Sequence, residues 1–193
     1  MPLILRKCWK NGLSRNDFYY GNTGDIVTCP DWDPKPECGN GLHGLLEGNG
    51  NWDLLVGSDW LVIEANESDI VNIDNQKCKF RTGKILFRGT ANQLINSEFP
   101  NKFNLNEHSA FNWAYFIGNK DIMIGKITSS YWAYKWAYNI GDKDVMINKI
   151  TESKWAYWWA YFFGNYNVMK PKVTDQIDIL LWNYSFPYDK ITT

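Results

Sequence analysis

The chain has 193 residues, of which 45% are hydrophobic and 21% are charged, an ordinary balance for a globular protein. Its formal net charge is −1 and neither half departs far from neutral, which argues against nucleic-acid binding, because that binding draws most of its affinity from phosphate neutralisation. No stretch approaches the roughly 20 apolar residues of a membrane span, and the start lacks a signal-peptide cleavage context. We therefore expect a cytoplasmic protein of the producing or host cell, with no membrane partner.

Aromatic residues are the unusual part of the composition. They make up 17% of the chain, with 11 Trp, 11 Tyr and 10 Phe, and most of the Trp residues lie after residue 104. Such an excess belongs either to a core that stacks on itself or to a surface that binds a partner.

The four cysteines show no disulfide framework and fit the reduced thiols of an intracellular protein. Cys29, Cys38 and His43, with Asp31 and Asp33 nearby, carry atoms that could bind zinc. Their C-x8-C and C-x4-H spacings lack the C-x2-C pair of strong zinc motifs. We therefore expect no metal site, and the sequence indicates no cofactor.

The first hundred residues read as short strands joined by loops. Apolar and β-branched runs predict strands at residues 25–29, 60–65, 69–73, 77–82 and 84–89. Gly83 is a turn candidate between the last two runs, and residues 91–99 form the one helical stretch. The pattern predicts an α+β module over residues 1–103, with a small, mostly antiparallel sheet.

A long loop rich in glycine and proline interrupts this module. Three Pro and five Gly lie between Pro30 and Gly50. Irregular segments of this length are often functional, and glycines allow a ligand to approach the backbone closely. We expect a pocket for a small nucleotide-like ligand within residues 29–48, with these candidate binding residues: Asp31, Trp32, Asp33, Gly39, Gly41 and His43.

From residue 108 onward the chain repeats itself with a 23-residue period. NWAYFIG (112–118) recurs as KWAYNIG (135–141) and WWAYFFG (158–164), and a partial fourth copy spans 177–186. Several identities at one fixed period mark a repeat architecture. We expect an all-α, solenoid-like array over residues 108–193, made of three helix–turn–helix repeats and a partial capping repeat.

The middle copy shows how each repeat is expected to fold. A first helix runs from near Tyr131 to Ile140, and Gly141 ends it in a left-handed conformation. Asp142 then caps a second, short helix over residues 144–150.

The repeated aromatic stripe is predicted to be mainly the core between repeats, because such stripes are usually stacking faces. The third copy, however, has more aromatic residues than one helix face can bury. Trp158 stands where the other copies have Asn112 and Lys135, which indicates a solvent-facing position turned apolar. We therefore take Trp158, Tyr157 and Phe162 as the candidate surface for a protein partner or for self-association.

Three stretches of the first half resemble an uncharacterised protein family of bacterial and phage genomes: NGLSRNDFYYG (11–21), CPDWDPKPECGNGLHGLLEG (29–48) and DWLVIEA (59–65). The family's pattern contains P-D-W, then E-C-G-x-G-L-H-G-L-L-x-G, then W-L-V-V-E-V. The resemblance covers residues 8–95, and it implies a module that is followed by helical repeats.

A second, looser resemblance concerns the order Gly39-x-Gly41-Leu-His43 before the strand 59–65. It is similar to the core of ADP-ribosyltransferase folds, in which an aromatic ring stacks on nicotinamide. The resemblance implies a nucleotide-acting enzyme with His43 in the place of that ring and Glu37 or Glu64 as the acid. A lone His flanked by glycines is more often a hydrogen-bonded structural residue.

Three functions therefore stay open. The sequence favours a non-enzymatic binding protein, with a ligand pocket in the first module and a partner surface on the repeats. The alternatives are the nucleotide-acting enzyme that uses His43 and a structural protein that assembles through its aromatic repeats.

Overall fold

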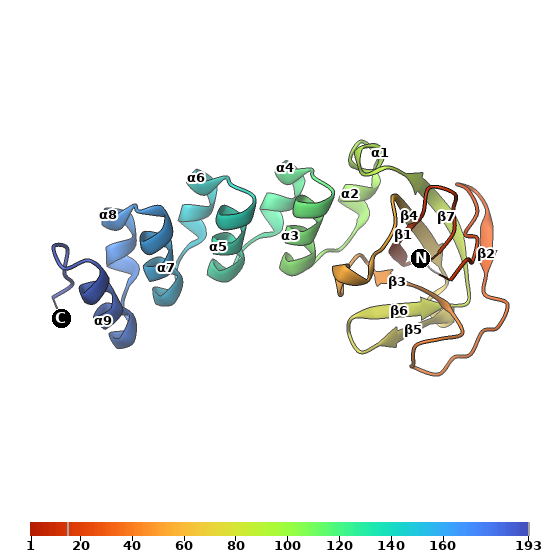
Figure 1. The fold of residues 1–193 in the computed structure, drawn as a ribbon, viewed down its shortest axis with the longest axis horizontal. Helices are drawn as coiled ribbons and strands as arrows, with labels where there is room; N and C mark the ends of the chain where they lie inside the picture. The colour runs from red at the N-terminus through yellow and green to blue at the C-terminus, as the bar shows by residue number, and fades with distance from the viewer. Residues whose placement is uncertain (15, 193) are drawn as a thin grey trace. The chain divides into compact units, whose positions relative to one another are not determined.

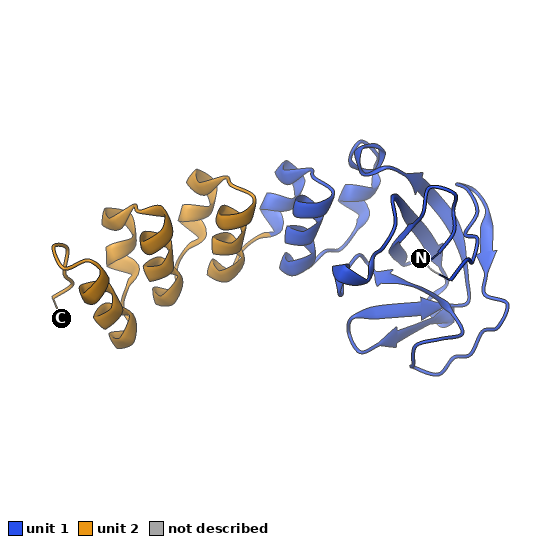
Figure 2. Ribbon diagram, in the orientation of Figure 1, with its two compact units in different colours: residues 1–126 blue, residues 127–193 orange. Residues whose placement is uncertain are grey.

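The computed structural model describes residues 1–14 and 16–192. The chain divides into two compact units, residues 1–126 and residues 127–193 (Figure 2). The first unit contains all the strands that are described and several helices, and the described elements of the second unit are helices (Figure 1). The predicted combination of a mostly antiparallel sheet and a helical C-terminal part is confirmed.

The sheet has seven strands in the described part of the chain, and all neighbouring pairs are antiparallel. Their order across the sheet is β2-β7-β4-β1-β3-β6-β5. The strands are β1 (Leu3–Cys8), β2 (Ile26–Thr28), β3 (Leu42–Leu46), β4 (Asp59–Ala65), β5 (Ile70–Ile73), β6 (Lys77–Phe80) and β7 (Thr82–Gly89).

Strand β1 lies in the middle of the sheet, although no strand was predicted at the start of the chain. Leu5 pairs with Val62 of β4 on one side and with Leu45 of β3 on the other. Ile4 and Leu5 point to opposite faces and are both fully buried, so both faces of β1 are covered. A strand buried on both faces reads as a continuous apolar run, which hides its alternation in the sequence.

Strand β3 falls inside the segment predicted as a loop, so that prediction is wrong for residues 42–46. Gly44 belongs to the strand, and a Cβ built there would lie 2.3 Å from the Ile4 Cγ2 atom of β1. This glycine therefore allows two strands to approach, rather than a chain reversal. The irregular part of the loop ends at Gly41.

The turn predicted at Gly83 is also wrong. Gly83 lies within β7 and pairs with Val27 of β2 and Ala65 of β4. A Cβ there would lie 2.5 Å from the Ile63 Cγ2 atom, so the strand again needs glycine for close packing. The break between β6 and β7 comes at Arg81, and the two strands pair with different neighbours.

Four longer helices begin at regular intervals along the chain: α3 (Glu107–Phe116), α5 (Ser130–Asn139), α7 (Ser153–Phe163) and α9 (Gln176–Ser185). Between them lie the four-residue helices α4 (Lys120–Met123), α6 (Lys143–Met146) and α8 (Tyr166–Met169). Each of these continues into a 3₁₀ turn: Ile124–Lys126, Ile147–Lys149 and Lys170–Lys172. Helices α1 (Ala91–Ile95) and α2 (Phe99–Lys102) precede α3 and divide the predicted helix at 91–99.

The turns between these helices follow one plan, which differs in one detail from the prediction. Gly141 follows α5 with a positive φ, as expected, but Asp142 does not cap α6 with its side chain. Asp142 itself has φ 55°, and its carboxylate accepts a hydrogen bond from Trp136 Nε1 at 3.1 Å. Asn and Asp tolerate the left-handed conformation better than other side chains, which explains their presence at this position.

Candidate functional site

A cavity of about 330 Å³ lies at the end of the glycine-rich segment, within the first unit. Four of the predicted ligand-binding residues line it: Asp31, Gly39, Gly41 and His43. Arg6 of β1 also lines it, together with Ser14, Phe18 and Tyr20 from the part of the chain that follows β1. Its volume lies within the range of about 300–1,000 Å³ that small-molecule sites occupy.

His43 sits on β3 opposite Lys79 of β6. Burial lowers the pKa of His43 to about 4, and the nearby charges of Lys77, Arg6 and Lys79 contribute in the same direction. The imidazole is therefore neutral at physiological pH. Its Nε2 atom is buried and has no hydrogen-bond partner among the described residues.

Arg6 contacts both His43 and the Tyr20 ring, which line the same cavity. Its Nη1 atom donates a hydrogen bond to the His43 carbonyl oxygen, and its Cζ atom lies 4.8 Å from the centre of the Tyr20 ring. The Arg6 Nε atom is buried without a partner in the described part of the chain. Burial raises the pKa of Tyr20 to about 12, so the phenol stays neutral. A charged donor and neutral hydroxyl groups suit an anionic or acceptor-rich ligand.

Three of the predicted ligand residues, Asp31, Trp32 and Asp33, have partners of their own. Cys29 donates a hydrogen bond through Sγ to Asp31 Oδ1 at 3.0 Å, and burial raises the pKa of its thiol. Lys79 Nζ lies 5.7 Å from the centre of the Trp32 ring, and Asp33 pairs with Lys35 at 3.6 Å. Trp32 and Asp33 do not line the cavity. Among the described residues, no group of His, Cys, Asp or Glu is placed to hold a metal ion.

The two glutamates named as candidate acids lie outside this cavity. Glu64 is on β4, where it pairs with Leu3 and Lys84. Glu37 is exposed on the loop. Neither one lines the cavity beside His43, so Asp31 is the one carboxylate among its described lining residues.

A larger cleft of about 740 Å³, which the sequence did not indicate, lies elsewhere in the first unit. It is lined by the turn after β3, by the β5–β6 hairpin and by one side of α3. Carboxamides are its most frequent side chains, and they are Asn49, Asn51, Asn72, Asn75, Gln76, Asn106 and Asn112. The three that cap or bridge backbone groups, Asn49, Asn51 and Asn106, hold α3 or the turn in place.

In the helical half, the WAY motif aligned at the 23-residue period (residues 113–115, 136–138 and 159–161, with Trp182 and Tyr184 in the partial copy) divides between core and surface. Its four tryptophans, Trp113, Trp136, Trp159 and Trp182, are all 0% exposed. The tyrosines two positions later are exposed in every copy, Tyr115 to 55%, Tyr138 to 57%, Tyr161 to 53% and Tyr184 to 88%. Two positions along an α-helix correspond to a rotation of about 200°, so the two side chains point in opposite directions. We call the three that lie in the second unit, Tyr138, Tyr161 and Tyr184, the tyrosine column.

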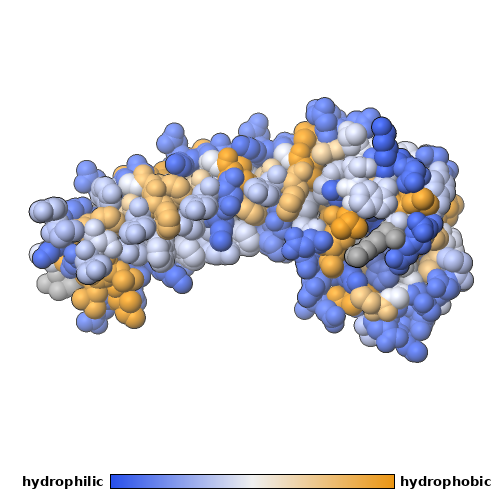
Figure 3. Space-filling view, viewed as in Figure 1, coloured by the Kyte–Doolittle hydropathy of each residue, from blue (hydrophilic) through white to orange (hydrophobic). Residues whose placement is uncertain are grey.

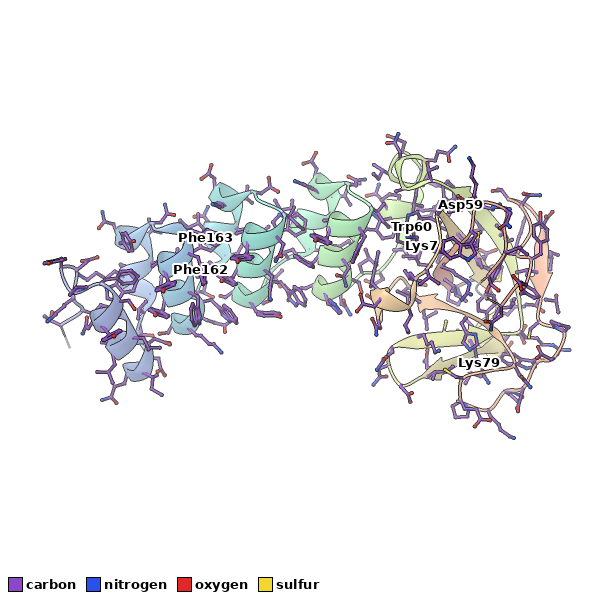
Figure 4. The ribbon with its side chains drawn as sticks, viewed as in Figure 1. Lys7, Asp59, Trp60, Lys79, Phe162 and Phe163 are labelled. Carbon is purple, nitrogen blue, oxygen red and sulfur yellow. The ribbon has the colours of Figure 1, made fainter. Side chains whose placement is uncertain are left out.

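Further aromatic rings of the second unit lie beside this column. Tyr138 lies 5.7 Å from Phe162, and Phe162 stacks on Trp158 at 5.8 Å. Lys143 Nζ lies 4.6 Å from the centre of the Phe163 ring, and Figure 4 labels Phe162 and Phe163 on α7. Of the three predicted partner residues, Phe162 is exposed, Trp158 is half-buried and Tyr157 is buried.

No protein-family model, curated protein or solved structure matches this chain. None of the helices in the part of the chain that the structure describes is long and apolar enough to cross a membrane.

Proposed function

We propose that this chain is a non-enzymatic binding protein whose helical repeats stack as a short solenoid and bind a protein partner through the tyrosine column. Two recurring contacts within the second unit support the stacking. Ser130 Oγ accepts hydrogen bonds from the backbone of Thr151 and Glu152, and Ser153 Oγ accepts them from Thr174 and Asp175. Each of these serines, at the start of a long helix, thus binds the backbone that leads into the next long helix.

The observation that carries the partner surface is the exposure of tyrosine at the same place in every copy. An isolated exposed aromatic residue is ordinary, but adjoining ones mark an interaction site. Tyr138, Phe162 and Tyr161 adjoin one another within the second unit. Tyrosine presents a rigid apolar ring with a polar tip, and it is enriched in protein interfaces.

The test compares the tagged full-length chain with the double variant Tyr138→Ser/Tyr161→Ser in the producing cell. We expect a protein that co-purifies in stoichiometric amount with the wild type and is lost from the double variant, while both melt at the same temperature. Asn148→Ser, an exposed change in the same unit, serves as the control and should keep the partner. Equal recovery by wild type and double variant would contradict the proposal.

A second candidate function concerns the cavity at His43, which we propose binds a small nucleotide-like ligand. The unpartnered Nε of Arg6 favours an anionic group there. A ligand that binds only the folded state raises the melting temperature, so millimolar NAD or a cyclic nucleotide should raise it in the wild type and not in Arg6→Met. No rise with either compound would count against this site. Binding is favoured over the ADP-ribosyltransferase-like alternative, because Glu37 and Glu64 do not line the cavity.

A further inference from the structure

Helix α9 exposes an apolar stripe on the second unit. Ile177 is 69% exposed, Leu180 66% and Leu181 41%. The space-filling view shows apolar residues gathered at this helix (Figure 3). Their spacing of i, i+3 and i+4 is that of a helix face which packs against another helix. We call these three residues the α9 stripe.

The position equivalent to Leu180 in the two preceding helices is in contact with the next long helix. In the alignment of the repeats, Leu180 corresponds to Tyr157 of α7 and to Tyr134 of α5. Tyr157 is only 5% exposed, and its hydroxyl lies 3.1 Å from Ser185 Oγ of α9. Tyr134 lies 5.2 Å from the Trp155 ring and 5.9 Å from the Phe163 ring, both on α7.

We propose that a second copy of this chain covers the α9 stripe, with the two α9 helices packed against each other about a twofold axis. Within the second unit the position equivalent to Leu180 is covered by side chains of another long helix, so a helix with an apolar face has the chemistry that suits the α9 stripe. A twofold arrangement sets each apolar residue against an apolar residue of the other copy. Asp178, the one acidic residue within the stripe's span, is itself buried and presents little charge to the partner.

The proposal predicts a dimer in solution that charged substitutions at Leu180 dissociate and that a mixture of opposite charges restores. Sedimentation equilibrium of the full chain should fit a monomer–dimer equilibrium. Leu180→Glu and Leu180→Lys should each weaken the dimer at least about tenfold, because each removes a buried leucine contact and adds a buried charge. Neither should lower the melting temperature of the monomer, since Leu180 lies at the surface of each copy.

Mixing the two variants gives the sharpest result. Opposite charges at the twofold contact should restore association in an equimolar mixture of Leu180→Glu and Leu180→Lys. Tyr138→Ser, an exposed change away from α9, is the matched control and should remain dimeric. A wild-type chain that stays monomeric at all concentrations would overturn the proposal, and so would a dimer that both Leu180 variants leave intact.

This inference uses different residues from the partner surface proposed above. The Leu180 variants should keep the co-purifying protein, whereas Tyr138→Ser/Tyr161→Ser should lose it and remain dimeric. Each proposal can therefore fail without the other.

Discussion

The sheet and the helices of the second half differ in how they bury and expose their apolar side chains. The sheet draws its core from strands far apart in the chain, and Ile4, Leu61 and Phe80 are all fully buried in one cluster. The repeats draw their core from equivalent positions in successive copies, and they expose most of the large apolar side chains that lie at the surface of the described residues. In the function that we propose, the sheet is therefore the scaffold and the helices, which display apolar residues, carry the binding surface.

The largest expected effect comes from the buried half of the WAY motif. Trp136 is fully buried and its indole N–H is satisfied by Asp142, so Trp136→Ala leaves a large cavity and an unpaired carboxylate. We expect a loss of about 3–5 kcal/mol in the free energy of unfolding, measured by urea denaturation. A loss below about 1 kcal/mol would show that the tryptophans are not the core of the repeats.

A slightly smaller effect is expected in the sheet, at the point where β1 and β3 approach. In Gly44→Ala the new methyl group would meet Ile4 Cγ2 at 2.3 Å and the Leu5 carbonyl oxygen at 3.0 Å. We expect the free energy of unfolding to fall by about 1–3 kcal/mol. Gly125→Ala is the matched control, because no atom lies within 4 Å of its added Cβ. Equal stability of the two variants would contradict the close approach of the strands.

The sheet should also contribute a pH-dependent term to stability through His43. The folded-state pKa of His43 is about 4, below its ordinary value of 6.5, so the unfolded chain binds a proton that the folded chain does not between these values. Stability should therefore fall as the pH drops from about 6.5 towards 4. His43→Gln should remove this contribution, which is measured as the difference between the urea midpoints of wild type and variant at pH 7 and pH 4.5. A difference that does not change with pH would contradict the low pKa.

The smallest effect on stability is expected from the exposed half of the motif. Tyr138→Ser should change the free energy of unfolding by no more than about 0.5 kcal/mol, as for most surface substitutions. The same urea denaturation, run beside Trp136→Ala, checks it. Similar losses in the two variants would remove the distinction between core and surface.

The sequence predicted these regions to different degrees, for physical reasons. The 23-residue period indicated the helices of the second half, because helical contacts are local. The rotation of about 200° between the Trp and Tyr positions could also have shown which of the two side chains lies in the core and which at the surface. Strand β4 was predicted from its apolar run, whereas β1 and β3 were missed. The apolar run of β1 is short, and the glycines of β3 were read as a loop, although Gly44 packs against Ile4.

The candidate cavity shows the same limit. The glycine-rich segment indicated His43, Gly39 and Gly41, which do line the cavity. Arg6 could not be named from the sequence, because only the pairing of β1 within the sheet brings it to β3. Tyr20 belongs to no strand and is likewise far from β3 in the chain. Residues joined by non-local pairing leave no periodic pattern in the chain.

Site-specific photo-crosslinking in the producing cell tests the central claim most directly. A photoreactive phenylalanine analogue would replace Tyr138 or Tyr161 in the full chain, with Asn148 as the exposed control position in the same unit. If the tyrosine column binds a protein partner, both tyrosine positions should give the same crosslinked product and position 148 should give none. Products of equal yield from all three positions, or none from Tyr138 and Tyr161, would contradict it.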